Sequence, residues 1–446
     1  MPLLGLAERA GLSRLIRQRV RFVSTRVASA GANPVGKLCS IIAGMAAGAD
    51  CIDDLDVIRS GGMPRVFAGV YAAATLGQLL REFTFGHARQ LASAARAHLV
   101  NLAGCTELLA GIENRAFVDI DSLLRPVYGH AKQGASFGHT RIGGRDLLRR
   151  GLSPLITTIS TGQAAPVVAG IRLRAGRARS SRGAASMVTE AINTARAAGA
   201  GDILVRGDSA FYTAAVVNAC VRAGVTFSVS VPHHIGVDQA IRKIPENAWT
   251  PVHYSDAVID PDTGELISAA EVAETTYTAF WQSDRPVTAR LMVRRVRDRG
   301  RDGKTEELFP VWRYHPFLTN STEPTTAADI THRGHAISET VFADLIDGPL
   351  AHLPSGRFGA NTAWAICAAI THNLLRAAGT LIGHNHAVAR GATLRRQLVL
   401  VPARLAQPQR RAVLHLPAHW PWAPQWHALW RQIFAPATGP PVTATN

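Results

Sequence analysis

The hydrophobic positions in the first part of the chain recur at helical spacing. In TLGQLLREFTFGHARQLASAARAHLVNLAG, residues 75–104, leucine and alanine return every three or four positions, with polar and basic residues between them. Gly104 stands where such a helix would end. We therefore predict that residues 1–112 form a helical region.

From residue 113 the pattern changes to strands, and then to strands that alternate with helices. Residues 117–121 alternate between Phe or Asp and a β-branched residue, which is typical of a strand. A glycine- and histidine-rich segment, residues 129–146, is predicted to be a loop. The remaining predicted elements are strands over 154–160, 165–174, 202–207 and 225–232, and helices over 184–200 and 213–225. Three strands followed by alternating helices and strands predict a mixed sheet with helices against its faces.

Three further regions complete the chain. Residues 233–325 contain strand-like runs and turn signals such as DPDTGE, and we predict a β-rich insertion there. Helices return over 326–385, where the segment 359–379 is apolar nearly all round and is expected in the core. Residues 386–446 form a basic C-terminal region. No apolar stretch approaches the roughly 20 residues of a membrane span, so no membrane partner is expected.

The charge of the chain favours a polyanionic partner. Lys and Arg number 48 against 32 Asp and Glu, which gives a formal net charge of +16. An excess of this size usually accompanies nucleic-acid binding, although a proteome rich in arginine also yields basic enzymes. The five cysteines lack the spacing of a zinc or redox site and are expected to be free thiols in a reducing compartment. We therefore expect a cytoplasmic, nucleic-acid-binding protein.

Acidic residues in the predicted sheet are the candidates for chemistry. Asp208 follows the buried run ILV, where it is either part of a site or the N-cap of the next helix. Asp119 and Asp121 share one face of an earlier strand, where the alternative is an edge that faces solvent. Carboxylates of this kind suit Mg²⁺ or Mn²⁺, and two such ions can drive phosphodiester cleavage when at least three carboxylates converge. Glu339, on a later amphipathic helix, is the best third candidate, and the alternative is a solvated helix residue.

Several segments, in order, resemble the transposase DDE domain group 1 family. They are DIDSLLRPVYGHAKQGASFGHTRIGGRDLLRRGLSPL, VRGDSAFY, and THRGHAISETVFADLIDG followed by GANTAWAICAAITHNLL. The resemblance implies an RNase H-like catalytic core whose first part is residues 113–232 and whose second part, with the Glu helix, is residues 326–385. It also implies that Asp121, Asp208 and Glu339 bind the metal ions. Asp119 remains the rival for the first position, and Ser122 favours Asp121, because a hydroxyl residue usually follows the family's first Asp.

The resemblance further implies an activity and its partners. We expect a bacterial insertion-sequence transposase that uses two Mg²⁺ ions, with Mn²⁺ as a substitute, to cut DNA at the element ends and transfer the 3′-hydroxyl into target DNA. Residues 1–112 would bind DNA or dimerise. The partners would be double-stranded DNA, both terminal inverted repeats and target, and a second copy in a synaptic complex near the nucleoid. The alternatives are an inactive or truncated copy that only binds DNA, and an RNase H-like nuclease without strand transfer.

Basic and histidine residues are the predicted DNA contacts. In related transposases a Tyr, an Arg and a later Lys around the Glu grip a DNA phosphate. Here His332 and His335 stand at the Tyr and Arg positions and Ile346 at the Lys position, so Arg333 would supply the charge. Two arginine-rich segments add further candidates, since arginine suits backbone phosphates. They are Arg177, Arg179 and Arg182 in one loop, and Arg294, Arg295, Arg297, Arg299 and Arg301 in the insertion.

Overall fold

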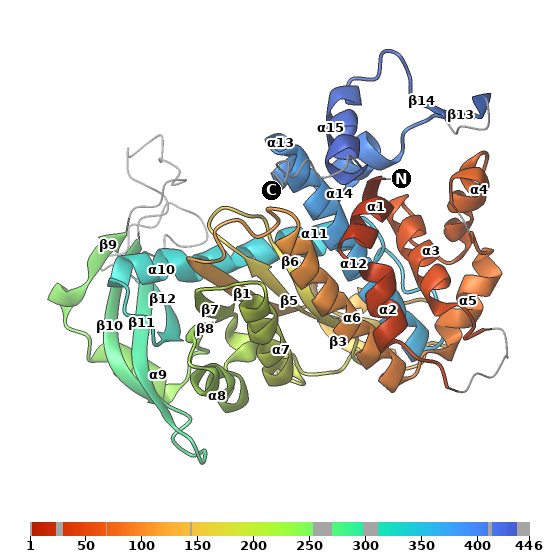
Figure 1. Ribbon diagram of the computed structural model, residues 1–446. Coiled ribbons are helices and arrows are strands. Elements are labelled where there is room, and N and C mark those ends of the chain that lie inside the picture. The colour runs from red at the N-terminus through yellow and green to blue at the C-terminus, as the bar shows by residue number, and fades with distance from the viewer. Residues whose placement is uncertain are drawn as a thin grey trace, which may run out of the picture.

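The computed structural model consists of a group of helices, a large sheet with helices on its faces, and an extension of that sheet (Figure 1). It describes residues 2–23, 30–67, 69–142, 145–252, 270–297, 311–408 and 413–434. The helices before the sheet are α1 (Pro2–Arg9), α2 (Leu12–Arg19), α3 (Pro34–Ala46), α4 (Met63–Val66), α5 (Ala73–Glu82) and α6 (Phe85–Gly104).

In the described part of the chain, the central sheet has nine strands. In spatial order they are β6 (Val167–Arg172), β5 (Leu155–Ser160), β1 (Arg115–Ser122), β7 (Asp202–Gly207), β8 (Thr226–Ser230), β12 (Trp312–Thr319), β11 (Val287–Arg297), β10 (Ala270–Ala279) and β9 (Thr250–Val252). β1 pairs in parallel with β7, and β7 with β8, while β5 and β6 run antiparallel to their neighbours. The five strands from β6 to β8, with α7 (Ala184–Ala197) between β6 and β7 in the chain, form the predicted RNase H-like core. The predicted fold class is confirmed.

The strands of residues 233–325 extend this core sheet. β12 pairs antiparallel with β8, with Phe317 opposite Ser230, so the sheet is continuous across the junction. β10 and β11 form a long hairpin beyond β12, and α9 (Ile235–Arg242) and the short β9 complete this sheet extension. The pairing of β12 with β8 therefore places residues of the extension directly beside the last strand of the core sheet.

Helices cover both faces of the sheet. Figure 1 shows α7 and α8 (Ala214–Ala223) below it, and α10 (Thr325–Arg333) and α11 (Ser338–Ile346) above it. The buried side chains of α7 include Met187, Val188, Ala191 and Ile192, which recur at helical spacing. α10 and α11 are joined by a short 3-10 turn, Gly334–Ile337.

The long helix α12 (Phe358–Ile382) lies between the N-terminal helices and the sheet. It packs against α3, α5, α6 and β6. Its 25 residues are, by length and composition, enough to cross a membrane, so the prediction that no apolar stretch approaches the length of a membrane span was wrong. In its most apolar stretch of 18 residues, 83% of the residues are buried in the protein, as in a core helix. The amide of Asn373 accepts from Val168 N at 2.8 Å and donates to Val168 O at 2.9 Å. These two bonds satisfy backbone groups on the free edge of β6.

The predicted loop over residues 129–146 was wrong. It contains β3 (Ser136–Ile142) and the start of β4 (Arg145–Leu152), which form a small sheet with β2 (Arg125–Pro126). The glycines had indicated turns, but Gly138 serves a close approach of two backbones. A Cβ built there would lie 2.3 Å from the carbonyl oxygen of Gly176, in the arginine-rich loop after β6.

The C-terminal part lies beside the first helices. It contains α13 (Asn385–Val388), α14 (Gly391–Leu394), β13 (Arg404–Ala406), β14 (Val413–His415) and α15 (Ala423–Phe434). Figure 1 shows α15 next to α1, and Arg9 Nη1 donates to Gln432 O at 2.8 Å between them. The two ends of the described chain thus pack together.

Candidate active site

Three carboxylates from distant segments come close together at the carboxyl ends of β1 and β7, in the middle of the core sheet. In the parallel pair of β1 and β7, Ile120 lies opposite Gly207, so Asp121 and Asp208 come next on neighbouring strands. Glu339 lies in the first turn of α11, which packs against β1. Both Asp208 and Glu339 are close enough to act on the pKa of Asp121. The structure therefore brings the three predicted residues together.

The electrostatics of Asp121 are those of a crowded acidic site. Burial, together with the charges of Asp208, Glu339 and Asp119, raises its pKa from 3.8 to about 7, against a backbone hydrogen bond from Ser122 N at 2.6 Å that lowers it.

The oxygens of the three carboxylates lie farther apart than the ligand atoms of a bound metal ion. Among the described residues, ligand atoms that all lie within 4.8 Å of one another occur only in the group Asp50, Cys51 and Asp54 of the N-terminal region.

Asp208 has one of the two roles that its position suggested, that of an N-cap. It is the N-cap of the short 3-10 helix Ser209–Phe211, and its Oδ1 accepts from Ala210 N at 2.9 Å. The buried run of β7 before it and the buried Phe211 after it fix its backbone. Partial desolvation raises the pKa of Asp208, against backbone hydrogen bonds and the nearby His335, which lower it. One carboxylate oxygen thus stays available at an exposed edge of the sheet.

Asp119 is held in a different way from Asp121. Its two oxygens accept from Arg206 Nε at 2.7 Å and Arg206 Nη2 at 2.9 Å, and the pair is almost completely buried. Burial raises the pKa of Asp119 and the guanidinium of Arg206 lowers it. Because both oxygens are occupied, this geometry favours Asp121 over Asp119 as the first metal ligand. The sequence signal for this buried ion pair was Arg206, a charged residue within the otherwise apolar segment ILVRG.

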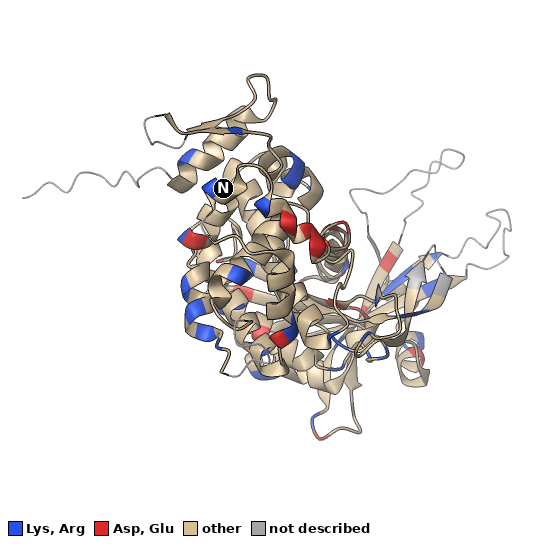
Figure 2. Cartoon of the chain, turned by 90° about the vertical axis from the view of Figure 1, so that its right-hand side faces the viewer, with Lys and Arg blue, Asp and Glu red and all other residues tan. Residues whose placement is uncertain are grey.

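The loop after β6 brings positive charge to the same edge. Arg177, Arg179 and Arg182 are exposed on it, and their DNA contacts stay a prediction. Lysine and arginine also occur on the N-terminal helices and on the sheet extension (Figure 2), but this loop, residues 174–182, is joined to the acidic cluster: Ser180 Oγ lies 3.1 Å from Ser122 Oγ, next to Asp121.

A buried arginine, which sequence reasoning did not single out, holds this loop. Arg174 Nη1 donates to the carbonyl oxygens of Arg179, Ser180 and Arg182, at 3.2, 2.7 and 3.2 Å. Its Nε and Nη2 bind Ser153. Burial, with Arg172 and Arg182 nearby, lowers the pKa of Arg174 to about 10, so it stays charged at neutral pH. The segment 174–182 contains four arginines, so residue type alone could not distinguish the buried one.

Comparison with known proteins decides the family. The model of the family described as transposase DDE domain group 1 matches residues 3–437. The chain belongs to this family. Its members are DNA transposases, enzymes that cut and transfer DNA and generally use divalent metal ions. No curated protein matches the chain. Among solved structures it is similar to a piggyBac transposase in a synaptic complex with hairpin DNA, with 12% sequence identity, a TM-score of 0.40, and coverage of 89% of this chain and 78% of that one. A similarity this distant carries no argument about the site.

The side chain of His332 is buried in the interior of the transposase. The imidazole lies flat on Phe317, with ring centroids 4.1 Å apart, and its two nitrogens meet Ser228 Oγ at 2.8 Å and Ser230 Oγ at 3.0 Å. Burial and nearby positive charges lower its pKa to about 3, so it is neutral. This placement argues against the predicted phosphate contact. His332 instead seats the end of α10 on the sheet.

The neighbours of His332 lie closer to the acidic cluster. His335 is half-buried, binds His332 O through Nδ1 at 2.7 Å, and is near enough to lower the pKa of Asp119 and Asp208. Arg206 Nη1 donates to Thr331 O at 2.9 Å, which ties this segment to the Asp119 pair. Arg333 is exposed, and its phosphate contact stays a prediction.

The arginines of the sheet extension differ from one another. Arg295 is buried between the rings of Trp249 and Trp312, with its guanidinium carbon 4.3 Å from each ring centroid, and it pairs with Glu246 and Glu271. This placement argues against the predicted DNA contact of Arg295. Arg297 is exposed at the end of β11 and stays a candidate. Arg299 and Arg301 lie outside the described residues.

Proposed function

We propose that this chain is a metal-dependent transposase that cuts DNA at the ends of a mobile element and joins the freed 3′-hydroxyl to target DNA. Asp121, Asp208 and Glu339 would hold two Mg²⁺ ions, with Mn²⁺ as a substitute. The proposal rests on one observation: strand pairing places Asp208, just after β7, next to Asp121 of β1, and Glu339 of α11 is close enough to act with it on the pKa of Asp121.

The donor set fits a hard divalent cation. Asp121 and Asp208 each use one oxygen to accept a backbone N–H, from Ser122 and Ala210, which orients the carboxylate and leaves the other oxygen for a metal. Carboxylate oxygens are the ligands that Mg²⁺ and Mn²⁺ prefer, and a cation would relieve the repulsion that raises the pKa of Asp121. When bound, two such ions activate the attacking oxygen and stabilise the leaving oxygen of a phosphodiester.

The rest of the site positions these ligands and the DNA. Arg206, bound to both Asp119 and Thr331 O, fixes the segment that precedes Glu339 against the sheet. The exposed arginines 177, 179 and 182 would neutralise backbone phosphates beside the acidic cluster. Family membership supports DNA as the partner. We further propose an insertion-sequence origin in a bacterium, terminal repeats and target DNA as the DNA partners, a homodimer in a synaptic complex, and a place in the cytoplasm near the nucleoid.

The test uses the full chain, Mg²⁺ and DNA that carries the sequences flanking the gene, scored for both cleavage and joining. We expect Asp208→Asn to lower both at least a hundredfold, because a loss of about 2.7 kcal/mol of transition-state stabilisation already gives that factor. Asp202→Asn is the matched control, since Asp202 is an exposed residue at the opposite end of the same strand.

The outcomes separate the alternatives. Cleavage by Asp208→Asn at the wild-type rate would refute the metal site. Cleavage without joining by the wild-type chain would indicate a nuclease, and DNA binding without cleavage in either Mg²⁺ or Mn²⁺ would indicate an inactive copy.

A further inference from the structure

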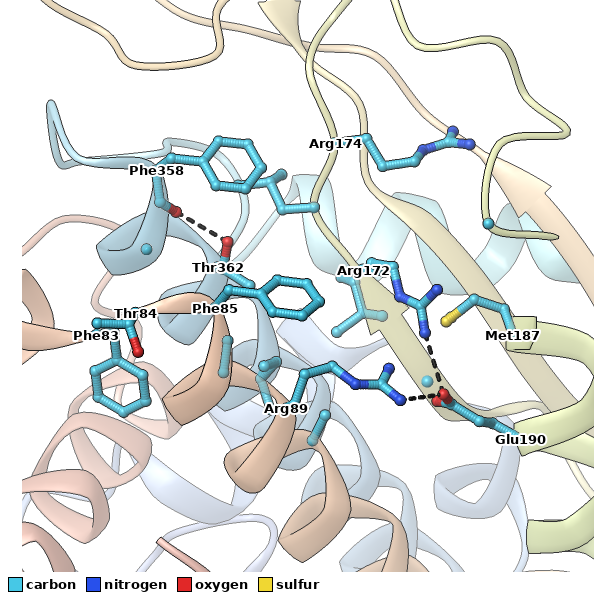
Figure 3. Close-up of a pocket in the computed structure, with 18 of the residues that line it drawn as sticks. Phe83, Thr84, Phe85, Arg89, Arg172, Arg174, Met187, Glu190, Phe358 and Thr362 are labelled. Atoms are coloured by element: carbon cyan, nitrogen blue, oxygen red, sulfur yellow. Dashed lines mark hydrogen bonds and ion pairs between the residues drawn. The ribbon is translucent and has the colours of Figure 1, made fainter. Parts of the chain in front are cut away.

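A cavity lined by apolar residues and several arginines lies at the end strand β6 of the sheet, outside the acidic cluster. It has a volume of about 540 Å³, within the range of about 300–1,000 Å³ that is usual for ligand sites. Figure 3 shows its lining, which comes from α6, β6 and the loop after it, α7 and the start of α12. None of the predicted metal ligands lines it.

The charged residues of the lining are mostly cationic. The described residues that line the cavity include one carboxylate, Glu190, and five arginines: Arg89, Arg96, Arg172, Arg174 and Arg182. Glu190 is shared by Arg89 at 2.7 Å, Arg96 at 2.9 Å and Arg172 at 3.1 Å. Burial first, and then neighbouring arginines, lowers the pKa of Arg96 and Arg172. One carboxylate cannot balance these cations, so the cavity suits an anion.

Backbone dipoles add to this field. Three helices begin at the cavity: α6 at Phe85, α7 at Ala184 and α12 at Phe358. Helix N-termini carry partial positive charge and attract phosphate groups. In the described part of the chain, the N-caps of α7 and α12 make no side-chain hydrogen bond to their helices. These dipoles support the arginines, which carry the argument.

Aromatic rings supply an apolar wall. Phe85 is 79% exposed although it lies at the cavity, and Phe358 also lines it. Figure 3 shows these two rings on one side and the guanidinium groups of Arg172 and Arg174 toward the other. An exposed ring opposite a cationic group suits a ligand with a planar base and a phosphate, because bases stack on aromatic side chains.

The cavity is close to the proposed cutting site. Leu155 of β5 pairs with Ser122 on one side and with Arg172 on the other, so Arg172 lies two strands from the residue after Asp121. Two strand spacings are about 10 Å. That distance equals about three base steps along one DNA strand. Arg182 of the arginine loop, residues 174–182, lines the cavity, and Ser180 of the same loop contacts Ser122.

We propose that this cavity binds a nucleotide of the DNA strand that is cut at the acidic cluster, with its phosphate at Arg172 and Arg89 and its base against Phe85 and Phe358. The identity of the strand rests on the proposed function; the binding of a nucleotide does not.

Binding in the absence of metal tests this proposal. The probe is a fluorescein-labelled single strand of 12 nucleotides, titrated with the full chain by fluorescence anisotropy over a series of salt concentrations in EDTA. We expect Arg89→Gln to reduce the slope of log K against log salt by about 0.7, the value for one lost phosphate contact on a single strand. Phe85→Ala should weaken binding roughly five- to hundredfold through lost stacking. Arg222→Gln, an exposed arginine on α8 outside the lining, should change neither quantity.

Each other outcome overturns the proposal. Arg89→Gln and Phe85→Ala with wild-type affinity and salt slope would exclude a nucleotide from the cavity, as would a wild-type chain that does not bind the strand. If free dAMP binds the wild type as tightly as the strand does, and Arg89→Gln and Phe85→Ala lose the same affinity for both, the ligand is a free nucleotide instead of DNA. Asp208→Asn serves to separate the two hypotheses, because it should bind the strand like the wild type even though it no longer cleaves.

Discussion

Replacing Asp121 by Asn should abolish cleavage and yet stabilise the fold. Asn keeps the size of the side chain, and its carbonyl oxygen can still accept the hydrogen bond from Ser122 N. What it removes is a charge in a crowded acidic site. One pKa unit corresponds to about 1.36 kcal/mol, so a rise from 3.8 to about 7 corresponds to about 4 kcal/mol lost when Asp121 ionises in the folded protein.

The sign of this effect fixes its pH dependence. The folded pKa of Asp121 is above the unfolded one, so the carboxyl is protonated in both states below pH 4 and costs nothing there. Between pH 4 and 7 the unfolded chain releases the proton more readily, and the stability of the wild type falls as pH rises. Above pH 7 the full cost is present. Asp121→Asn should therefore gain over the wild type across this window and keep a constant advantage above it.

Thermal unfolding in EDTA at pH 4.5, 6 and 8 measures the difference. For 446 residues unfolding together, 1 kcal/mol corresponds to about 1 °C, so we expect Asp121→Asn to melt about 2–4 °C higher at pH 8 and nearly equal to the wild type at pH 4.5. Mg²⁺ should raise the melting temperature of the wild type and leave Asp121→Asn nearly unchanged. Asp202→Asn controls for a change of net charge. A variant that melts at or below the wild-type temperature at pH 8 would refute the reasoning.

Two further substitutions test the residues that support the site. Asp119→Asn should lower stability by about 3–5 kcal/mol, because it leaves Arg206 buried without its anion; thermal unfolding would contradict this if Asp119→Asn matched the behaviour of Asp121→Asn. Arg174→Met should release the arginine loop, so limited trypsin digestion followed by mass spectrometry should show faster cleavage after residues 177 and 179, and an unchanged rate there would show that other contacts hold the loop.

The core sheet could be predicted because its signals are local. Alternation in β1, the apolar run of β7 and the amphipathic pattern of α7 each lie within one segment. The small sheet of β3 and β4 could not, because its glycines have the composition of a turn. Their purpose is visible only when the loop after β6 is in place, since Gly138 makes room for the backbone of Gly176. The same holds for Arg174 and Arg295, whose burial depends on partners from other segments.

The choice between Asp119 and Asp121 depends on strand register, which alternation cannot supply. Both residues point to the same face of β1, and the pairing of Asp119 with Arg206, 87 residues later, assigns one to the interior and the other to the edge. A slip of two residues would place Asp121 opposite Arg206 and remove it from the acidic cluster. The register is set where both strands begin: Asp202 N donates to Asn114 O at 3.2 Å, and a Cβ on Gly201 would lie 2.1 Å from Glu113 O. A glycine far from the chemistry thus helps to decide which carboxylate is free to hold a metal.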